Sequence, residues 1–300
     1  MRITQTHLHQ LANTSVRNAR ERLIEAQQVA VSGAKVTKPS DDPALASRAR
    51  LTRSLLAQSD SHQRNIDFGT LQLDRGEQAL AAVSNVLVRA KELALAMATD
   101  TINGTQRTLA AGEINELRGA AIDLANTQIG EEYVFSHVNT TSPPVDSVGN
   151  FTYDADLHQS VRRAEVGPAA QAEVGASGSH AFAQRAADPS SVDVFAVLGD
   201  LVIDLNANDT DAIRASVDQL NTAMDQVIAE RSRLGLRSNR LQTASESVQD
   251  TKTVYRKLES DLVDADAAEA FSYLNLAETG LQAALAVTAR ILGPSLLDSL

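Results

Sequence analysis

The sequence predicts a mainly α protein, built as a long antiparallel coiled-coil helical rod with a small β-rich outer domain inserted between its N- and C-terminal halves. Two observations support this fold. An apolar residue recurs at every seventh position over residues 213–262, and proline is absent between Pro43 and Pro143 and between Pro189 and Pro294. A seven-residue apolar repeat keeps one stripe of a helix against a partner helix, whereas an interior proline would break such a helix.

The apolar repeat of the C-terminal half defines the predicted rod. A helix over residues 213–262 would be about 75 Å long at a rise of about 1.5 Å per residue, so it needs an equally long partner. The second series of positions turns polar from Arg231 onward, so the buried stripe is narrow. The repeat, which we interpret as the seam of the rod, consists of Ile213, Leu220, Val227, Leu234, Leu241, Val248, Tyr255 and Leu262.

The N-terminal half contains a matching pair of seven-residue series, which predicts the partner helix. The second series contains Gly69 and Gly76, and we expect these small residues to let another segment of backbone approach closely. The chain would therefore run up the rod in its first half and return in its second half. The two series are Ile66, Leu73, Leu80, Leu87 and Ala94, and Gly69, Gly76, Val83, Ala90 and Met97.

Capping residues predict where the first helices end and begin. The first helix is an amphipathic segment, with Ala-rich stripes, that Gly33 is expected to end as a left-handed C-terminal cap. Asp42 followed by Pro43 predicts an N-cap with proline at the first helical position. Ser40 and Asp41 add further polar acceptors at the same helix start.

Two helices are expected in the remainder of the first half, on either side of a turn at Asn103-Gly104. The first extends over residues 43–99 and the second ends at about Gln128. The inner side of the second helix is predicted to carry Leu109, Ile114, Leu117, Ile122 and Leu124.

The character of the chain changes near Gly130, where proline and glycine become frequent. Short alternating pieces at 133–135, 151–153 and 160–162 predict strands and hairpins. We interpret residues 131–188 as the small β-rich outer domain, which is too short to be an independent enzyme fold.

The C-terminal half is expected to contain three helices. The first covers residues 192–205, and Asp209 or Thr210 caps the long rod helix. Asp264 and Asp266 mark a second capped start. The last helix ends at Gly293-Pro294 and has Leu274 and Leu281 on one apolar series and Phe271, Leu285 and Leu292 on the other.

These signals divide the chain into consecutive parts. Residues 1–38 and 266–300 are terminal helices, and residues 39–130 and 189–265 are the two parts of the rod. The outer domain, 131–188, lies between the rod parts. The terminal stripes are too thin and too rich in alanine to bury enough area alone, so each terminal helix needs a partner.

Composition excludes several classes of protein. Hydrophobic residues make up 43% of the 300 residues but aromatic residues only 3%, which suits helix seams better than a thick globular core. The net charge of −11 argues against a nucleic-acid partner. Cysteine is absent, which excludes disulfides, thiol catalysis and thiolate metal sites. No apolar run approaches the length of a membrane span and no signal-peptide core is present, so we expect neither membrane insertion nor signal-directed secretion.

No motif for catalysis or for cofactor or metal binding is found. The six histidines are scattered, and we expect them to be surface residues. Asp41-Asp42 could be a catalytic carboxylate pair, but adjacent acids at a helix start are better explained by capping. The clusters Arg17, Arg20, Arg22 and Arg48, Arg50, Arg53 are interpreted as solvated faces that could meet acidic surfaces of neighbouring subunits. The sequence therefore predicts a protein that is not an enzyme.

The capping segment Ser32–Pro43, with the sequence SGAKVTKPSDDP, resembles the N-terminal signature of the bacterial flagellin family, which includes flagellins and hook–filament junction proteins. The resemblance covers most of residues 1–135 and 210–300. One departure is Phe135-Ser-His137, where the family often has Phe-x-Gly. Further matching segments are Asn65-Ile66, Leu80–Leu93, Glu113–Leu117, Ala125–Thr127, Tyr133–Phe135, Arg233–Leu241, Asp264–Asp266, Ala268–Ala270 and Leu281–Ala283.

Within this family, Met1–Thr4 and Ser295–Leu300 are more similar to the junction branch than to flagellins. The resemblance implies a structural adaptor between hook and filament, exported through the flagellar export apparatus with an export chaperone and assembled outside the cell. It implies a tubular homo-oligomer beside a neighbouring hook-associated junction protein and flagellin, with terminal helices that are disordered in the monomer. The residues expected to drive assembly are Leu8, Leu11, Val16, Leu23, Leu274, Leu281, Leu285 and Leu292.

Other functions stay open at this point. The nearest alternative is a flagellin that forms the filament itself. A secreted coiled-coil effector or translocator would insert its amphipathic ends into a membrane, but the charged side chains and the lack of bulky apolar residues in those ends argue against insertion. An enzyme carried by residues 131–188 is the most remote alternative.

Overall fold

The structure, a computed structural model, describes residues 5–36, 38–40, 42–136, 140–152 and 161–292. The chain forms two compact units. The terminal unit comprises residues 1–58 and 251–300, and the central unit comprises residues 59–250. Two long helices, α2 (Pro43–Met97) and α6 (Thr210–Val263), contribute residues to both units. Each unit is described by itself.

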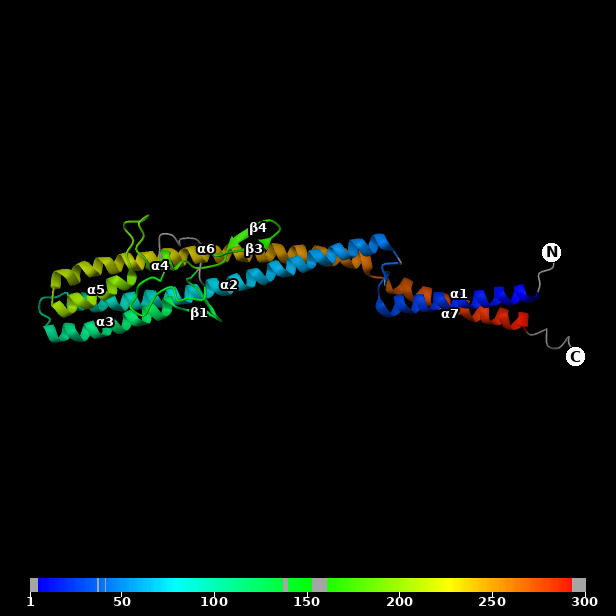
Figure 1. Ribbon diagram of the computed structural model, residues 1–300, viewed down its shortest axis with the longest axis horizontal. Helices are drawn as coiled ribbons and strands as arrows, with labels where there is room; N and C mark the ends of the chain where they lie inside the picture. The colour runs from blue at the N-terminus through cyan, green and yellow to red at the C-terminus, as the bar shows by residue number, and fades with distance from the viewer. Residues whose placement is uncertain (1–4, 37, 41, 137–139, 153–160, 293–300) are drawn as a thin grey trace. The chain divides into compact units, whose positions relative to one another are not determined.

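The terminal unit contains helix α1 (Gln5–Ser32) and helix α7 (Ala267–Leu292), which pack against each other (Figure 1). Gly33 has a φ of +66° and ends α1 as a left-handed cap, as the sequence predicts. Asp42 Oδ1 accepts the backbone N–H groups of Ala44 and Leu45, both at 2.9 Å, and so caps the start of α2. Asp41 lies outside the described residues.

In the central unit, α2 and α6 run antiparallel to each other (Figure 1). Gln63 Nε2 donates a hydrogen bond to Ser245 Oγ at 3.0 Å, and Glu77 pairs with Arg231 at 2.6 Å. Residue numbers therefore increase along α2 in the direction in which they decrease along α6, as in an antiparallel pair. Asp209 Oδ1 accepts the N–H groups of Asp211 and Ala212 and caps α6.

The rod seam predicted on α6 faces the core of the central unit. Ile213, Leu220, Val227, Leu234, Leu241 and Val248 are all buried, whereas Tyr255 and Leu262, which belong to the terminal unit, are half-buried. The same holds on α2, where the first predicted series is buried throughout. Those α2 residues are Ile66, Leu73, Leu80, Leu87 and Ala94.

Gly69 and Gly76 of α2 allow a close approach of a neighbouring segment, as the sequence predicts, although the nearest atoms belong to side chains and not to backbone. A Cβ atom at Gly69 would lie 2.6 Å from Val174 Cγ1, and one at Gly76 would lie 3.1 Å from the Cβ atom of Ala176. The segment around residues 174–176 therefore lies directly on α2.

The rest of the central unit adds two helices and two small sheets. Helices α3 (Gly104–Ala125) and α5 (Val194–Ala207) pack against each other. Strands β1 (Gln128–Ile129) and β2 (Glu132–Tyr133) form one antiparallel pair, in which Gln128 lies opposite Tyr133. Strands β3 (Arg163–Gly167) and β4 (Ala170–Glu173) form the other, with Arg163 opposite Glu173 and an irregularity before Gly167.

Residues 131–188, the predicted outer domain, contribute buried side chains to one hydrophobic cluster that also contains residues of α2, α3, α5 and α6. Phe182, in the short helix α4 (Gly178–Phe182), links the two sets of side chains. Its ring centroid lies 5.1 Å from that of Phe135 and 5.6 Å from that of Phe195 on α5. This segment is also less β-rich than predicted, because it contains α4 and long stretches without regular structure.

Several element boundaries differ from the prediction. Helix α3 ends at Ala125, three residues early, because the side-chain amide of Asn126 exchanges hydrogen bonds with the backbone of Val145. The strand expected at 133–135 is observed as β2, which begins one residue earlier, at Glu132, and ends at Tyr133. Val134 and Phe135 lie in a turn after β2 and are buried, because tertiary packing outweighs their strand propensity.

The other strand predictions are also displaced. The hairpin expected from 160–162 begins at Arg163, and Phe151 makes only a single bridge, to Val145. Residues 153–160 lie outside the described residues.

Two side chains predicted from their pattern are placed differently. Leu109 of α3 was expected on the inner side but is 71% exposed, because the small Ala110 and Ala111 occupy the buried face. His62 was expected at the surface but is buried, and neither of its ring nitrogens has a hydrogen-bond partner.

Candidate assembly surface

The seam between α1 and α7 is thin and rich in alanine. On each helix, buried and half-buried residues follow each other at alternating spacings of four and three, which places them on one stripe. Because α1 packs against α7, these two stripes face each other. The α1 stripe is Ala12, Val16, Ala19, Leu23, Ala26 and Ala30, and the α7 stripe is Ala270, Leu274, Ala277, Leu281, Ala284 and Thr288.

The structure divides the predicted assembly residues into two groups. Val16, Leu23, Leu274 and Leu281 lie in the seam between α1 and α7 and are half-buried. By contrast, Leu11 is 57% exposed, and Leu285 of the second predicted series is 51% exposed.

Leu8 and Leu292 lie within α1 and α7 but outside the residues whose side chains are described. The second predicted series of α7 is not the one that faces α1. The face of α7 that packs against α1 carries alanines beside its leucines, and these small residues let the helices approach closely. Phe271 and Leu285 lie outside this face and are exposed.

Large apolar side chains cover the outer faces of α1 and α7 and are accessible to solvent. Val31 is 89% exposed, and Leu276 is 69% exposed. A helix that contacts only one partner is expected to be polar outside its seam. Apart from Phe271, sequence analysis missed these residues because they do not belong to the seven-residue series. Besides Leu11 and Leu285, the other exposed large apolar residues of these helices are Ile24, Phe271, Tyr273 and Val287.

Two hollows lie in this surface. One, of about 600 Å³, lies where α1 ends and α7 begins, and it is lined by residues that include Val29, Tyr273 and Leu276. The other, of about 490 Å³, lies on the last turns of α1 and is lined by Ile24, Gln27, Gln28, Val31, Ser32 and Lys38.

Backbone hydrogen bonds join the segment between α1 and α2 to the segment between α6 and α7. Lys35 N–H donates to the carbonyl oxygen of Val263 at 2.7 Å, and Ala265 N–H donates to that of Gly33 at 2.8 Å. Ala34 thus forms a β-bridge with Asp264. Asp266 Oδ1 accepts the N–H groups of Ala268 and Glu269 and caps α7, as predicted. The segment that follows α1 is therefore held to the segment that precedes α7. Ser40 and Pro43 are exposed there.

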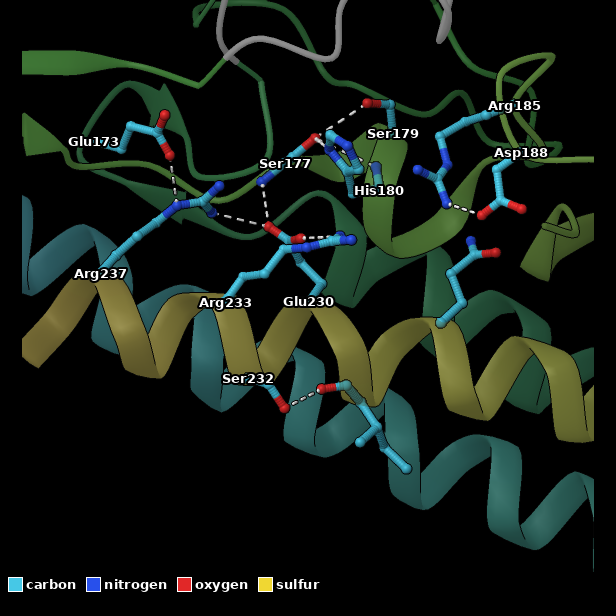
Figure 2. Close-up of polar contacts among 12 residues, drawn as sticks. Glu173, Ser177, Ser179, His180, Arg185, Asp188, Glu230, Ser232, Arg233 and Arg237 are labelled. Atoms are coloured by element: carbon cyan, nitrogen blue, oxygen red, sulfur yellow. Dashed lines mark hydrogen bonds and ion pairs between the residues drawn. The ribbon is translucent and has the colours of Figure 1, made fainter. Parts of the chain in front are cut away.

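A second group of polar side chains, which we call the Glu230 cluster, lies in the central unit (Figure 2). Glu230 of α6 is completely buried and pairs with Arg233 and Arg237, each at 3.0 Å. It also accepts the backbone N–H of Ser177 at 3.3 Å. Arg237 continues to Glu173 at 3.0 Å. The cluster thus binds the segment 173–177 to α6.

Ser177 and His180 resemble a catalytic pair in distance only. Ser177 Oγ lies 2.7 Å from His180 Nδ1, but Ser177 is 3% exposed and its oxygen caps α4 by accepting the N–H of His180. Burial lowers the pKa of His180, an effect that the nearby carboxylate of Glu230 opposes and the guanidinium of Arg185 reinforces. A buried serine offers no access for a substrate, so we interpret the cluster as structural.

Within the described ranges, no helix is long and apolar enough to cross a membrane. The same residues contain no group of three or more His, Cys, Asp or Glu side chains that could hold a metal ion.

Residues 3–140 match the family model of the bacterial flagellin N-terminal helical region, and residues 217–298 match that of the bacterial flagellin C-terminal helical region. The chain belongs to the bacterial flagellin family. The two matches cover helical regions at both ends of the chain. They confirm the family resemblance found in the sequence.

This flagellin-family chain is similar over its whole length to two characterised relatives. It is 25% identical over 299 residues to flagellar hook-associated protein 3 of Escherichia coli K12, an alignment that covers 94% of each chain. It is 23% identical over 313 residues to flagellar hook-associated protein 3 of Salmonella typhimurium, and this alignment covers 99% of the chain and 98% of the relative.

Solved structures share the fold of this flagellin-family chain. Flagellar hook-associated protein 3 from Legionella pneumophila gives a TM-score of 0.61 at 15% identity, covering 71% of this chain and 98% of that one. FlgL from Bacillus cereus gives 0.57 at 17% identity, covering 70% and 99%. The flagellar junction protein FlgL from Legionella pneumophila gives 0.56 at 16% identity, covering 72% and 99%.

Proposed function

We propose that this protein is a non-enzymatic structural component of the bacterial flagellum that joins the hook to the filament. The observation that carries the proposal is the end-to-end similarity to two proteins named flagellar hook-associated protein 3, which covers 94% or more of every chain compared. A flagellin that forms the filament is the alternative function, and both of these relatives carry the name of the junction component instead.

The surface of the terminal unit supports an assembly role. Its helices bury only an alanine-rich seam against each other and leave large apolar side chains exposed, which is the property of a surface that packs against further subunits. In this function, copies of the chain pack through α1 and α7 into a tubular homo-oligomer. A hook-associated junction protein and flagellin would be the neighbours of that oligomer.

The proposed route to this position follows from the same function. The chain is exported, unfolded at its terminal helices, through the flagellar export apparatus with the help of an export chaperone, and it is assembled outside the cell. Helices α2 and α6 form a coiled-coil rod that carries the segment 131–188 as the outer part of the molecule.

Immunogold electron microscopy tests this function directly. An antibody raised against residues 131–188 is applied to flagella of the source cell, and flagella of cells that lack the protein are the control. Label at a single position, between hook and filament, is the expected result. Label along the whole filament would instead identify a flagellin, and flagella without any specific label would exclude a flagellar function.

A further inference from the structure

The last two turns of α1 carry an empty hole of the kind that receives a side chain from a partner helix. Ile24, Gln27, Gln28 and Val31 line one hollow of about 490 Å³. Their spacing of three, four and seven residues is that of the four side chains that surround one knob in knobs-into-holes packing. The occupant with the matching geometry is therefore a large apolar side chain on a helix.

The α7 helix of the same copy lies on another face of α1. The side chains that α1 buries against α7 include Leu23, Ala26 and Ala30, whereas Ile24 is 47% exposed and Val31 is 89% exposed. The hole is thus on the side of α1 that its own partner helix does not cover. A second helix must come from another molecule.

Leu276 has the properties of the missing knob. It is the most exposed large apolar side chain among the described side chains of α7, at 69%. It also lines the larger hollow together with Val29 of α1. Val29 lies within the stretch 24–31 that forms the hole, so Leu276 lies near the level of the hole along the helix pair, and the two hollows share no lining residue. A neighbouring copy displaced sideways, without a shift along the helices, brings its Leu276 to this hole.

The charges around the two surfaces are complementary. Lys38 lies beside the hole and lines the same hollow as Val31. Asp266 and Glu269 lie beside Leu276 and line the other hollow, which also contains Lys35. A neighbour placed in this way would bring an acidic edge to a basic one.

We propose that Leu276 of one copy inserts into the hole formed by Ile24, Gln27, Gln28 and Val31 of the next copy. The contact is heterologous, because the hole and the knob are different surfaces of the same chain, and such contacts generate rings or helical tubes instead of closed dimers. This inference rests on the proposed function, and it names the residues through which one copy recognises the next.

Disulfide trapping in intact flagella tests the contact. Because the chain contains no cysteine, every disulfide within or between copies of a chain with Gln28→Cys and Leu276→Cys must join introduced residues. Flagella from cells whose only copy carries both substitutions are oxidised and analysed on denaturing gels. We expect a ladder of covalent multimers larger than dimers, which disappears on reduction.

The matched control replaces the knob position by an equally exposed leucine in the central unit. Leu109 on α3 is 71% exposed, so a chain with Gln28→Cys and Leu109→Cys should remain monomeric under the same oxidation. Ladders that are equal in both variants, a trapped dimer without larger species, or only monomers in flagella that contain the variant would each overturn the contact.

A second variant keeps the test independent of disulfide geometry. Leu276→Ala should lower the amount of protein retained in flagella by at least about tenfold, because it empties a buried site at every contact. Leu109→Ala should leave the amount unchanged. An unchanged amount for Leu276→Ala would overturn the contact alone. The absence of the wild-type protein from flagella would instead refute the proposed function.

Discussion

The chain contains two antiparallel helix pairs with the same seven-residue repeat, and they differ in how fully they are packed. In the central unit, the seam of α6 is buried from Ile213 to Val248 and its partner series on α2 is buried from Ile66 to Ala94. In the terminal unit, Leu23 and Leu281 are only half-buried. The additional covering in the central unit comes from α3, α5 and the segment around Val174, which share its hydrophobic cluster.

The two pairs also differ in their charges. The central pair has cross-helix ion pairs such as Glu77 with Arg231, and α6 carries the fully buried Glu230 with two arginines. The described side chains of α1 and α7 have none, although Arg17 and Glu269 are exposed and could take part. A repeat of seven thus indicates that a helix has partners, and only the completeness of its contacts shows whether all of them are in the same molecule.

The largest expected effect comes from the buried charge of the central pair. Glu230→Ala should lower the free energy of unfolding by about 3–5 kcal/mol, because it leaves the largely buried Arg237 with one of its two carboxylate partners and Ser177 N–H without its acceptor. Glu77→Ala, which breaks a partly exposed ion pair, should cost about 1 kcal/mol or less. Chemical denaturation followed by circular dichroism measures both. Equal losses would mean that the cluster does not hold the unit together.

The second prediction compares the two seams directly. Leu234 is 1% exposed, so Leu234→Ala should cost about 2–5 kcal/mol in the isolated chain. Leu274→Ala removes a half-buried side chain and should cost roughly 1 kcal/mol. The same denaturation experiment decides the question. A cost for Leu274→Ala as large as that for Leu234→Ala would show that the terminal pair is complete within one copy.

Two glycines on the long helices should respond to alanine in opposite directions. Gly69→Ala introduces a Cβ atom only 2.6 Å from Val174, which should cost about 1–3 kcal/mol through overpacking. Gly235→Ala has nothing within 4 Å and should stabilise α6 by up to about 1 kcal/mol through helix propensity. Melting temperatures of the two variants provide the measurement. If Gly69→Ala were stabilising as well, the segment 174–176 would not be held against α2.

The smallest expected effect is the pH dependence of His180. Because burial lowers its pKa from the ordinary 6.5, the unfolded chain binds more protons than the folded chain on the acid side of that value. The free energy of unfolding should therefore fall as the pH decreases through about 6.5 and level off below the lowered pKa. The groups that face this side chain are Glu230, Arg185, Arg233 and Arg237.

His180→Gln tests this effect, because it removes the titrating group. Stability measured between pH 8 and pH 5 should depend less on pH in this variant than in the wild type. Identical pH profiles would show that His180 does not contribute. If the substitution changes the pH dependence of unfolding of the central unit but not that of α1 and α7, the two helix pairs unfold independently.

Sequence alone predicts the parts of this molecule that local rules determine. The left-handed cap at Gly33, the N-cap at Asp42 and the uninterrupted helices follow from residue type and spacing, and the structure confirms them. The close approach at Gly69 was also predictable, because a glycine inside an apolar series has little other use. The coiled-coil nature of the rod and its domain boundaries stay predictions.

The parts that were missed depend on contacts between distant segments. Glu230, Arg233 and Arg237 stand on one face of α6 at a spacing of three and four, but their partner near Glu173 is far away in the sequence. Leu109 was predicted on the inner side of its helix and Phe271 on an apolar series, whereas both are exposed and alanines occupy the buried faces. Periodicity locates a stripe, and it does not say which of two neighbouring stripes a partner will choose.

The joined breaks at Gly33 and Asp264 have a consequence for the order in which the molecule is completed. Helix α1 is near the start of the chain, and its partner α7 is near the end, so closing this pair spans almost the whole polypeptide. Contacts of such long sequence separation carry the greatest loop-closure entropy and form late. A truncated chain that ends before Ala267 can still present α1, but it has neither the partner seam nor Leu276. If the proposed contact forms, only a polypeptide that extends through α7 can offer both of its sides.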